Sequence, residues 1–428
     1  MRHLRIITLR KYENESYELS NYVTLYSIIN ELKKKFSLED IWLVEEGGSS
    51  DKNYIKTKKF YNIFRYNNFN EVLDEFEPDC ILTISGDFEY LSRSMLKCCH
   101  MRKIPTVNIM SSVFEYGYFK KEISIKIITG RINFIRENGK NILKKYIFLL
   151  RTLISSGYSI MSIIKNVIKD IYLPLLSFEP RYNFGGATLN LVSNPKWRDF
   201  LINKGIDDHR IIVVGECSMD KLYNHINEIK KSMVDTDLDR SIGNIIRILL
   251  ITTPMVEHGY WNSTMRDDII NRVLSSLTNN YGNRAIITIK IHPVHEKEIT
   301  FQKIAKNLNS RIQIIKKADL PTLISESDLV IGYGITSAYF QVLLLKKPLV
   351  LINFFNEDYS KNIFLREKMA IECRNTGELI KWIDIREQIQ IDDKKLAAII
   401  HEIFYRFDGN CTRRAVEAIC SLLHSEKY

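Results

Sequence analysis

Histidine, lysine and hydroxyl side chains follow several β-branched runs in the second half of the chain. The run IIRILLIT is followed by Thr253 and then His258, and the run AIITIKI contains Lys290 and is followed by His292. Pro293 ends that run and fixes the direction of the chain there. Imidazole, ammonium and hydroxyl groups are hydrogen-bond partners of phosphate, ribose and bases. These positions predict a nucleotide-binding site, with helix capping by His292 and an ordinary turn after Thr253 as simpler alternatives.

The stretch SDLVIGYGITSAYFQVLLLKKPLVLINF carries the most specific pattern of the chain. A buried strand is expected to end at Gly332 and Gly334, and Thr336 and Ser337 then stand where the next helix begins. Hydroxyls and N–H groups at a helix start favour an anion. Gln341, about one turn further along, is placed to face a ribose. The alternatives are that Thr336 or Ser337 only caps the helix and that Gln341 is only exposed.

Carboxylates follow strand candidates in the first half of the chain. Glu45 and Glu46 follow IWLV, Asp87 and Glu89 follow DCILTIS, and Glu115 follows PTVNIMSSV. A transferase needs such a group to take the proton from an acceptor hydroxyl. Carboxylates after strands are also routine helix caps. Asp87, Glu45 and Glu46 are therefore candidate bases, and the sequence does not choose among them.

Parallel sheets are the elements that must position these residues. In the first third, LRIIT, DIWLVEE, DCILTIS and PTVNIM are strand candidates, and helical periodicity covers 20–36 and 88–101. The runs IIRILLIT, AIITIKI, RIQII, DLVIG and PLVLIN repeat this alternation after residue 244. Such alternation predicts βαβ units. The expected fold class is α/β, with two Rossmann-like doubly wound domains facing a central cleft and ligands beyond the carboxyl ends of the strands.

A polar stretch at 235–244 is the expected boundary between the domains. It separates 1–234, with a basic helical insertion at about 118–178, from 244–391. Residues 392–428, with a break at Asp408 and Gly409, are expected to pack back toward the first domain.

The insertion carries much of the positive charge of the protein. Between 118 and 173 a surplus of eight positive charges results from eleven basic and three acidic residues. This composition suits either a membrane surface or ordinary amphipathic helices with a solvated face. The residues counted are Lys120, Lys121, Lys126, Arg131, Arg136, Lys140, Lys144, Lys145, Arg151, Lys165 and Lys169 against Glu122, Glu137 and Asp170.

Length and composition narrow the class of protein. With 428 residues and 45% apolar composition the chain can bury two cores. The IITL run is cut by RKYENE, so we expect no export signal and a cytoplasmic location. The uncharged stretch 152–164 is shorter than the ~20 residues of a spanning helix. Seven scattered cysteines and unpatterned histidines predict reduced thiols, no metal and no cofactor. Nucleic acid is not an expected partner because no aromatic-rich binding motif accompanies the charge.

Residues 189–419 resemble the GT-B superfamily, particularly capsule and teichoic-acid polymer transferases and, more distantly, UDP-GlcNAc 2-epimerases. TIKIHPVHE resembles the Lys-x-His-Pro element of the superfamily, and SDLVIGYGITSAYFQVLLLKKPLVLINF resembles its donor-binding strand, hydroxyl pair and helix. IIVVGECSMDKL is similar to its hinge-region strand, and FDGNCTRRAVEAI to its Asp-Gly and Arg element. The matching positions in these last two elements are Gly215, Asp220, Asp408, Gly409 and Arg413.

Departures from these families bear on the donor. Gln341 stands where sugar-nucleotide transferases often carry a ribose-binding Glu and glycerophosphotransferases an Asp. The Asp-Tyr-Ser-Ser pattern of the latter falls on 334–337, which keeps the hydroxyl pair and loses the acid. TVNIMSS after Pro105 has no Glu where epimerases carry one. A similarity to bacterial sialyltransferases, whose acid-acid-Gly and His-Pro motifs match 45–47 and 292–293, keeps a CMP-linked donor open.

The resemblance implies an inverting, metal-independent glycosyltransferase. It would move a sugar from a UDP- or CMP-linked donor to a surface-polysaccharide or lipid-linked glycan acceptor at the inner face of an anionic membrane. An N-domain carboxylate would activate the acceptor while the second domain stabilises the leaving phosphate. The alternatives are a glycerophosphotransferase with a CDP-polyol donor, a UDP-GlcNAc 2-epimerase-like isomerase or hydrolase, and a non-catalytic membrane-associated binding subunit. The expected donor-site residues are Thr253, His258, Lys290, His292, Gly334, Thr336, Ser337 and Gln341.

Overall fold

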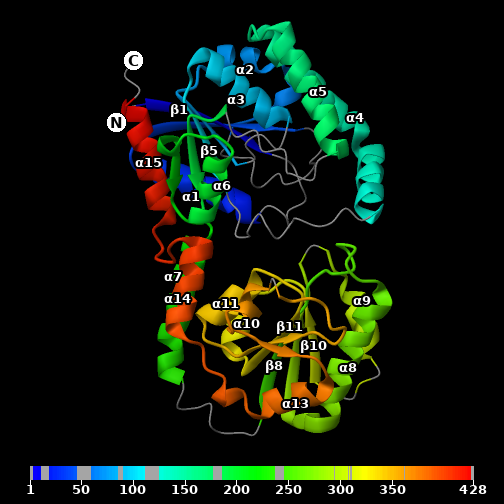
Figure 1. Cartoon of the computed structure of the whole chain (residues 1–428). Coiled ribbons are helices and arrows are strands. Elements are labelled where there is room, and N and C mark those ends of the chain that lie inside the picture. Colours follow the sequence, from blue (N-terminus) through cyan, green and yellow to red (C-terminus); the bar gives the residue numbers. More distant parts are fainter. Residues whose placement is uncertain are drawn as a thin grey trace. The chain divides into compact units, whose positions relative to one another are not determined.

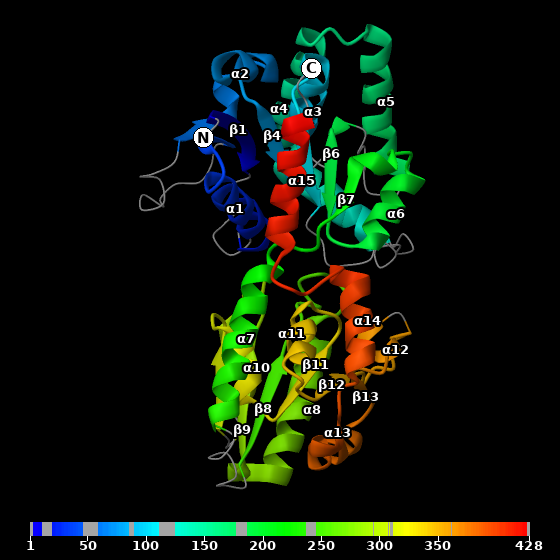
Figure 2. The ribbon, with the colours of Figure 1, turned by 90° about the vertical axis from the view of Figure 1, so that its left-hand side faces the viewer.

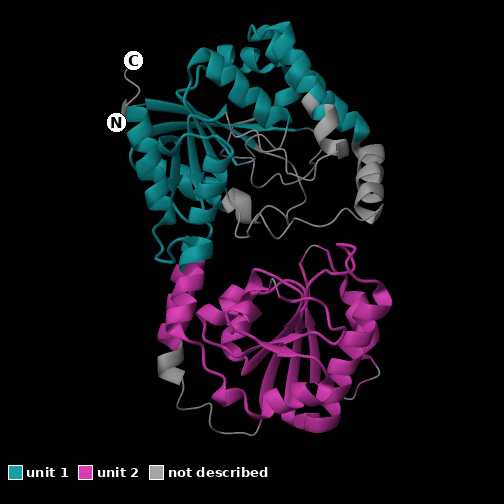
Figure 3. Ribbon diagram, viewed as in Figure 1, with its two compact units in different colours: residues 1–220, 401–428 teal, residues 221–400 magenta. Residues whose placement is uncertain are grey.

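The computed structural model of the chain contains two compact units (Figure 3). It describes residues 3–10, 19–45, 59–84, 90–110, 125–176, 186–236, 245–293, 295–306, 308, 311–360 and 362–425. Unit 1 comprises Met1–Asp220 and His401–Tyr428, and unit 2 comprises Lys221–Ile400. The chain passes between the units in helices α7 (Met219–Thr236) and α14 (Asp393–Phe404). Most of the predicted linker, 237–244, lies outside the described residues, and the predicted domain ranges stay a prediction.

Unit 1 is built on a seven-stranded parallel sheet in the order β3-β2-β1-β4-β5-β6-β7 (Figure 1). Its aliphatic runs are covered on both faces, as parallel strands require, and Leu4, Ile6 and Ile7 of β1 are fully buried. The four strands predicted in the first third are confirmed as β1, β2, β4 and β5. The strands are β1 His3–Arg10, β2 Ser37–Val44, β3 Lys59–Asn62, β4 Cys80–Thr83, β5 Thr106–Met110, β6 Leu189–Val192 and β7 Ile211–Val213.

Helices cover this sheet, and two long ones occupy the predicted insertion. Asparagine side chains start two of the helices: Asn68 caps α2, and Asn194 caps α6 with a proline at its first turn. The helices are α1 Leu19–Lys33, α2 Phe69–Phe76, α3 Tyr90–Arg102, α4 Ile125–Ser155, α5 Ile160–Leu176, α6 Pro195–Asn203 and α15 Cys411–Ser425.

The last helix belongs to the core of unit 1. Helix α15 lies along α1, as Figures 1 and 2 both show. Ala415 and Ile419 of α15 share one buried cluster with Ile28 of α1 and Leu4 of β1. The first sheet of the protein is therefore completed by residues from the far end of the sequence.

Unit 2 contains a six-stranded parallel sheet in the order β10-β9-β8-β11-β12-β13. The five strands predicted after residue 244 are confirmed, so two doubly wound α/β units are present as expected. The strands are β8 Ile246–Ile251, β9 Ala285–Lys290, β10 Arg311–Ile315, β11 Leu329–Tyr333, β12 Leu349–Ile352 and β13 Ile371–Cys373. The helices are α8 Ser263–Tyr281, α9 Glu298–Ala305, α10 Leu320–Glu326, α11 Ala338–Leu344, α12 Ile363–Arg366 and α13 Thr376–Asp384. Within the described part of the chain, no helix has the length and apolar character needed to cross a bilayer.

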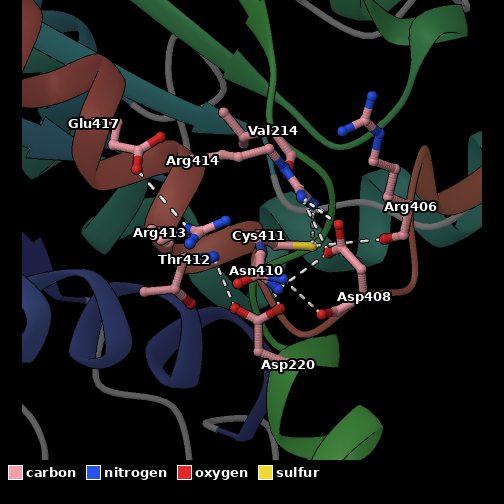
Figure 4. Close-up of polar contacts among 10 residues, drawn as sticks. All are labelled: Val214, Asp220, Arg406, Asp408, Asn410, Cys411, Thr412, Arg413, Arg414 and Glu417. Carbon is pink, nitrogen blue, oxygen red and sulfur yellow. Dashed lines mark hydrogen bonds and ion pairs between the residues drawn. The ribbon is translucent and has the colours of Figure 1, made fainter.

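A polar cluster within unit 1 joins the start of α7 to the start of α15 (Figure 4). The Asp220 carboxylate accepts hydrogen bonds from the backbone N–H groups of Cys411 (2.9 Å) and Thr412 (2.7 Å), the first residues of α15. The Arg414 guanidinium donates both to the Asp408 carboxylate (2.7 and 3.0 Å) and to the Val214 carbonyl (2.8 Å). These bonds fix the two connecting segments to each other.

This polar cluster shows the structural roles of two motif positions. Gly215 has φ 91°, and a Cβ there would lie 2.6 Å from the Cys411 Sγ, so the position requires glycine. The arginine that binds Asp408 is Arg414, the neighbour of the Arg413 that matches the Asp-Gly and Arg element. Arg413 is exposed and lies 3.8 Å from Glu417, one turn along the same helix.

Candidate functional site

The candidate site lies at the carboxyl edge of the sheet in unit 2. Strands β9 and β10 follow β8 on one side, and β11 lies on its other side, so the direction of winding reverses between β8 and β11. Ligands of doubly wound sheets bind at such a switch point. Thr253 follows β8 and Gly334 follows β11, and the structure brings these two predicted residues together. The Thr253 hydroxyl donates to the carbonyl of Tyr333 at 2.7 Å.

The backbone after β11 passes close to the loop after β8. Gly334 has φ 66°, and a Cβ there would lie 2.8 Å from the Met255 Sδ. Its N–H donates to the Tyr359 hydroxyl at 3.1 Å. Thr253 is buried, and the bond from its hydroxyl to the Tyr333 carbonyl joins the end of β8 to the end of β11.

Three histidines from the loops after β8 and β9 form one cluster. The rings of His292 and His295 stack with centroids 4.9 Å apart, and the ring of His258 lies 5.2 Å from that of His295. The backbone N–H of His295 donates to the His292 Nδ1 at 3.3 Å. The sequence predicted His258 and His292 for the site, and the structure places His295 between them.

The electrostatics favour neutral imidazoles at His292 and His258. Burial, together with the neighbouring His295 and His258, lowers the pKa of His292 to about 4. Burial and His295 also lower the pKa of His258. A neutral His292 that accepts at Nδ1 carries its proton on Nε2. That nitrogen can donate a hydrogen bond to a phosphate or ribose oxygen.

A buried glutamate, which the sequence analysis did not single out, holds the His292 loop in place. Glu296 is 1% exposed, and its Oε2 accepts hydrogen bonds from the backbone N–H of His292 at 2.7 Å and from the Thr252 hydroxyl. Burial raises the pKa of this carboxyl group. The signal in the sequence is only an acid four residues after His292, and that spacing is equally typical of an exposed loop.

Lys290 is buried at the end of β9, and its side chain donates hydrogen bonds to backbone carbonyls. Its Nζ donates to the carbonyls of Ile291 at 2.8 Å and Lys316 at 2.9 Å, which ties the end of β9 to the end of β10. Burial lowers the pKa of Lys290. Two of its three N–H bonds are thereby used, so at most one is left for a donor phosphate.

The remaining predicted donor residues lie at and within α11. The Thr336 hydroxyl accepts from the Ala338 N–H at 3.3 Å, and Ser337 occupies the exposed cap position without a side-chain cap bond. The Gln341 Oε1 is buried and has no hydrogen-bond partner among the residues that the structure describes. Gly332, one residue before the end of β11, has no room for a side chain because a Cβ would lie 2.2 Å from the Tyr339 hydroxyl.

One of the three candidate bases in unit 1 can be placed. Glu45 follows β2 and is buried, with an oxygen 2.5 Å from the Nζ of Lys145 on α4. Glu46 and Asp87 lie outside the described residues. The carboxylate of Glu45 thus fixes α4 to the carboxyl edge of the sheet, and a role in proton transfer would compete with that ion pair.

The described residues form no group of three or more His, Cys, Asp or Glu side chains able to hold a metal ion. The seven cysteines predicted to be reduced are free thiols, and six of them are buried. Burial raises the pKa of the Cys373 thiol to about 12, which is typical of a structural cysteine.

Acidification should destabilise the protein through His292. Its pKa is near 4 in the folded protein and ~6.5 in an unfolded chain. The unfolded state therefore binds the extra proton first, and the stabilisation present above about pH 6.5 is lost as the pH falls toward 4. NMR titration of the imidazole and urea unfolding at several pH values would test this. An ordinary midpoint near 6.5, or the same pH dependence in His292→Gln, would contradict it.

Comparison with known proteins gives the fold a name. No family model matches the chain, and no curated protein matches it by sequence. Among solved structures it is similar to the UDP-GlcNAc 2-epimerase of Neisseria meningitidis bound to UDP-GlcNAc, with 13% identity, a TM-score of 0.52 and coverage of 98% of this chain and 100% of that one. The UDP-GlcNAc 2-epimerase of Methanocaldococcus jannaschii gives 14% identity, a TM-score of 0.53 and coverage of 98% and 100%.

A glycosyltransferase is similar to the same degree. The calicheamicin glycosyltransferase CalG4 matches with 11% identity, a TM-score of 0.52 and full coverage of both chains. Together with the two doubly wound sheets, these similarities establish a GT-B fold with two Rossmann-like domains. Fold alone does not select a reaction, and the neighbours include both epimerases and glycosyltransferases.

Proposed function

We propose that this protein is a GT-B glycosyltransferase that binds a nucleotide-activated sugar at the carboxyl edge of unit 2. The observation that supports this most directly is the gathering of loops at the switch point. Thr253 and Gly334 lie beside each other there, and the three histidines extend from the adjacent loops. A nucleotide bound here would meet imidazole donors and backbone N–H groups.

The proposed reaction is an inverting transfer. A carboxylate of unit 1 would take the proton from the acceptor hydroxyl as that oxygen attacks the anomeric carbon, and the bond from that carbon to the nucleotide phosphate would break. The His292 Nε2–H would donate to the leaving phosphate, where negative charge develops. Asp87 and Glu46 remain candidates for the base, and Glu45 is the least suited because it already pairs with Lys145.

The proposed donor is UDP- or CMP-linked, and the proposed acceptor is a surface polysaccharide such as a capsule, or a lipid-linked glycan, at the inner face of the membrane. A thermal-shift screen with UDP, CMP, CDP, GDP and dTDP would identify the nucleotide. Stabilisation by UDP or CMP above all others is expected. Preference for CDP would instead favour a CDP-polyol donor and a glycerophosphotransferase.

Transfer and epimerisation can be separated by one incubation. The purified protein is mixed with a panel of nucleotide sugars, with and without candidate acceptors, and the sugar and the released nucleotide are analysed. A glycosyltransferase releases nucleotide in step with glycosylated acceptor. Conversion of UDP-GlcNAc to its C2 epimer without acceptor would overturn the proposal in favour of an isomerase. Tight nucleotide binding without turnover would favour a binding subunit.

Activity is expected to persist in an excess of chelator. The reason is that the proposed site meets phosphate charge with imidazole and backbone donors instead of a divalent ion. The measurement is the transfer rate before and after treatment with EDTA, with a magnesium-dependent transferase as the positive control. Complete loss that magnesium or manganese restores would show that the mechanism needs a metal.

A further inference from the structure

The outer surface of helices α4 and α5 is unusually apolar for an exposed surface. Of the thirteen large apolar side chains that are exposed among the described residues, seven lie on these two helices, with exposed fractions from 40% to 77%. Apart from the adjacent Ile160 and Met161, they recur at intervals of three, four or seven residues within each helix, which places them along one side of it. They are Leu143, Ile147 and Ile154 of α4 and Ile160, Met161, Ile164 and Ile168 of α5.

The inner side of helix α4 packs in the core of unit 1. Phe148, Leu149 and Leu153 of α4 are buried and pack toward α3 and α2. Helix α4 therefore has an ordinary core-facing side, and its exposed apolar side chains are additional to it. An exposed surface of this kind marks an interaction site.

The basic residues of these helices also divide into inward-pointing and outward-pointing side chains. From 138 to 169 the chain has six Lys and Arg and no acidic residue. Lys145 points inward to the buried Glu45, and the first acid after this stretch, Asp170, pairs with the buried Arg93 at 2.7 Å. The outward cations are Lys140, Lys144, Arg151 and Lys165, all exposed.

Three of the outward cations line one groove. A cavity of about 430 Å³ lies between α4 and the turn before α2, and the described residues of its lining include Lys140, Lys144, Arg151 and Arg65 but no carboxylate. The Lys144 Nζ lies 3.9 Å from the centre of the Phe64 ring. Arg65 also pairs with Glu75 at 2.9 Å, so part of its charge is compensated.

We infer that the outer surface of α4 and α5 docks on an anionic lipid bilayer, with lipid phosphates entering the cationic groove and the seven apolar side chains entering the interface. A soluble anion would fit the groove but would leave the apolar residues exposed. An acidic bilayer matches both features, because its phosphates and acyl chains are presented together. This inference deepens the proposed membrane location of the enzyme and rests on it.

The test is co-sedimentation of the full-length protein with vesicles of phosphatidylcholine alone or mixed with phosphatidylglycerol, at low and high salt. Binding is expected only to the anionic vesicles and is expected to weaken with salt. Each engaged cation contributes about fivefold in affinity, so the triple variant Lys140→Gln/Lys144→Gln/Arg151→Gln should bind about a hundredfold more weakly. Lys145 is left unchanged because it pairs with the buried Glu45.

Matched controls lie in unit 2. The variant Lys303→Gln/Lys394→Gln/Lys395→Gln removes the same charge from exposed positions and should bind like the wild type. Ile160→Ser/Ile164→Ser/Ile168→Ser should weaken binding by tenfold or more at constant charge. Ile299→Ser, at an apolar residue that is 55% exposed, should not.

Several outcomes would overturn the inference. Failure of the wild type to bind anionic vesicles at low salt would do so. An equal loss of vesicle binding in the α4 triple variant and in the unit 2 control variant would do so as well. Release of the protein from vesicles by glycerol 3-phosphate would indicate a soluble phosphate site, and capture of an acidic protein in place of vesicles would indicate a protein partner. Nucleotide-induced thermal shifts, measured on the same variants, report separately on the proposed donor site.

Discussion

Alanine in place of His292 is expected to weaken donor nucleotide binding about tenfold or more. Loss of a hydrogen bond to a charged group costs ~1.5–3 kcal/mol, and each 1.4 kcal/mol is a tenfold change in Kd. The variant keeps the backbone N–H that donates to Glu296, so the loop retains its anchor. Calorimetric titration with the nucleotide that stabilises the wild type most would give the change in Kd.

Two comparisons make this result specific. His209→Ala, at an exposed histidine of unit 1, should leave the affinity unchanged. Ser337→Ala is also expected to weaken binding, because its hydroxyl makes no cap bond in α11 and is available to a ligand. If both the His292 and Ser337 variants fold and bind the nucleotide as tightly as the wild type, the site lies elsewhere.

Alanine in place of Gly215 should destabilise unit 1 by about 2–5 kcal/mol. A residue with a side chain pays about 1–2 kcal/mol to adopt a left-handed backbone, and overpacking adds about 1–3 kcal/mol. Here φ is 91° and the added Cβ would lie 2.6 Å from the Cys411 Sγ and 3.2 Å from the Phe404 carbonyl oxygen. Gly205 offers a matched control, because its φ is 86° and nothing lies within 4 Å of the added Cβ.

The measurement must report on unit 1 by itself, since two units need not unfold together. Replacing Trp261 and Trp382 with Phe leaves Trp42 and Trp197, both in unit 1, as the fluorescent probes. In this background Gly205→Ala should cost about 1–2 kcal/mol and Gly215→Ala more. Combining Gly215→Ala with Cys411→Ala should recover part of the difference. Equal effects of the two glycine substitutions on the free energy of unfolding would show that the polar cluster tolerates a side chain at position 215.

Most strands could be predicted from the sequence because their aliphatic runs are buried on both faces. The edge strands β3 and β13 could not, since KFYN and IEC are short and mixed in polarity. The two helices at the end of the chain were expected as one helix with a break at Asp408 and Gly409, and Gly409 indeed has φ 68°. Turn chemistry is local, and local signals are legible in a single sequence.

The parts of the site that depend on contacts between distant residues were not predictable. Lys145 looks like another surface cation, yet it pairs with Glu45 a hundred residues away. Arg413 and Arg414 are adjacent in the sequence, and only the phase of α15 decides which of them meets Asp408. Glu296 lies in a loop of acidic and basic residues, and the sequence there does not distinguish a buried glutamate that binds the backbone from an exposed one.

The placement of α15 in the core of unit 1 dictates an order of assembly during protein synthesis. Unit 2 is one continuous stretch, Lys221–Ile400, and can fold as soon as it leaves the ribosome. Unit 1 must wait for Cys411 and the helix that it begins, because Ala415, Val416 and Ile419 complete the buried cluster around α1. At ~5–20 residues per second, the interval between Asp220 and Cys411 lasts roughly 10–40 s. During that time the apolar side of α1 stays uncovered, and unit 1, which begins before unit 2 in the chain, is completed after it.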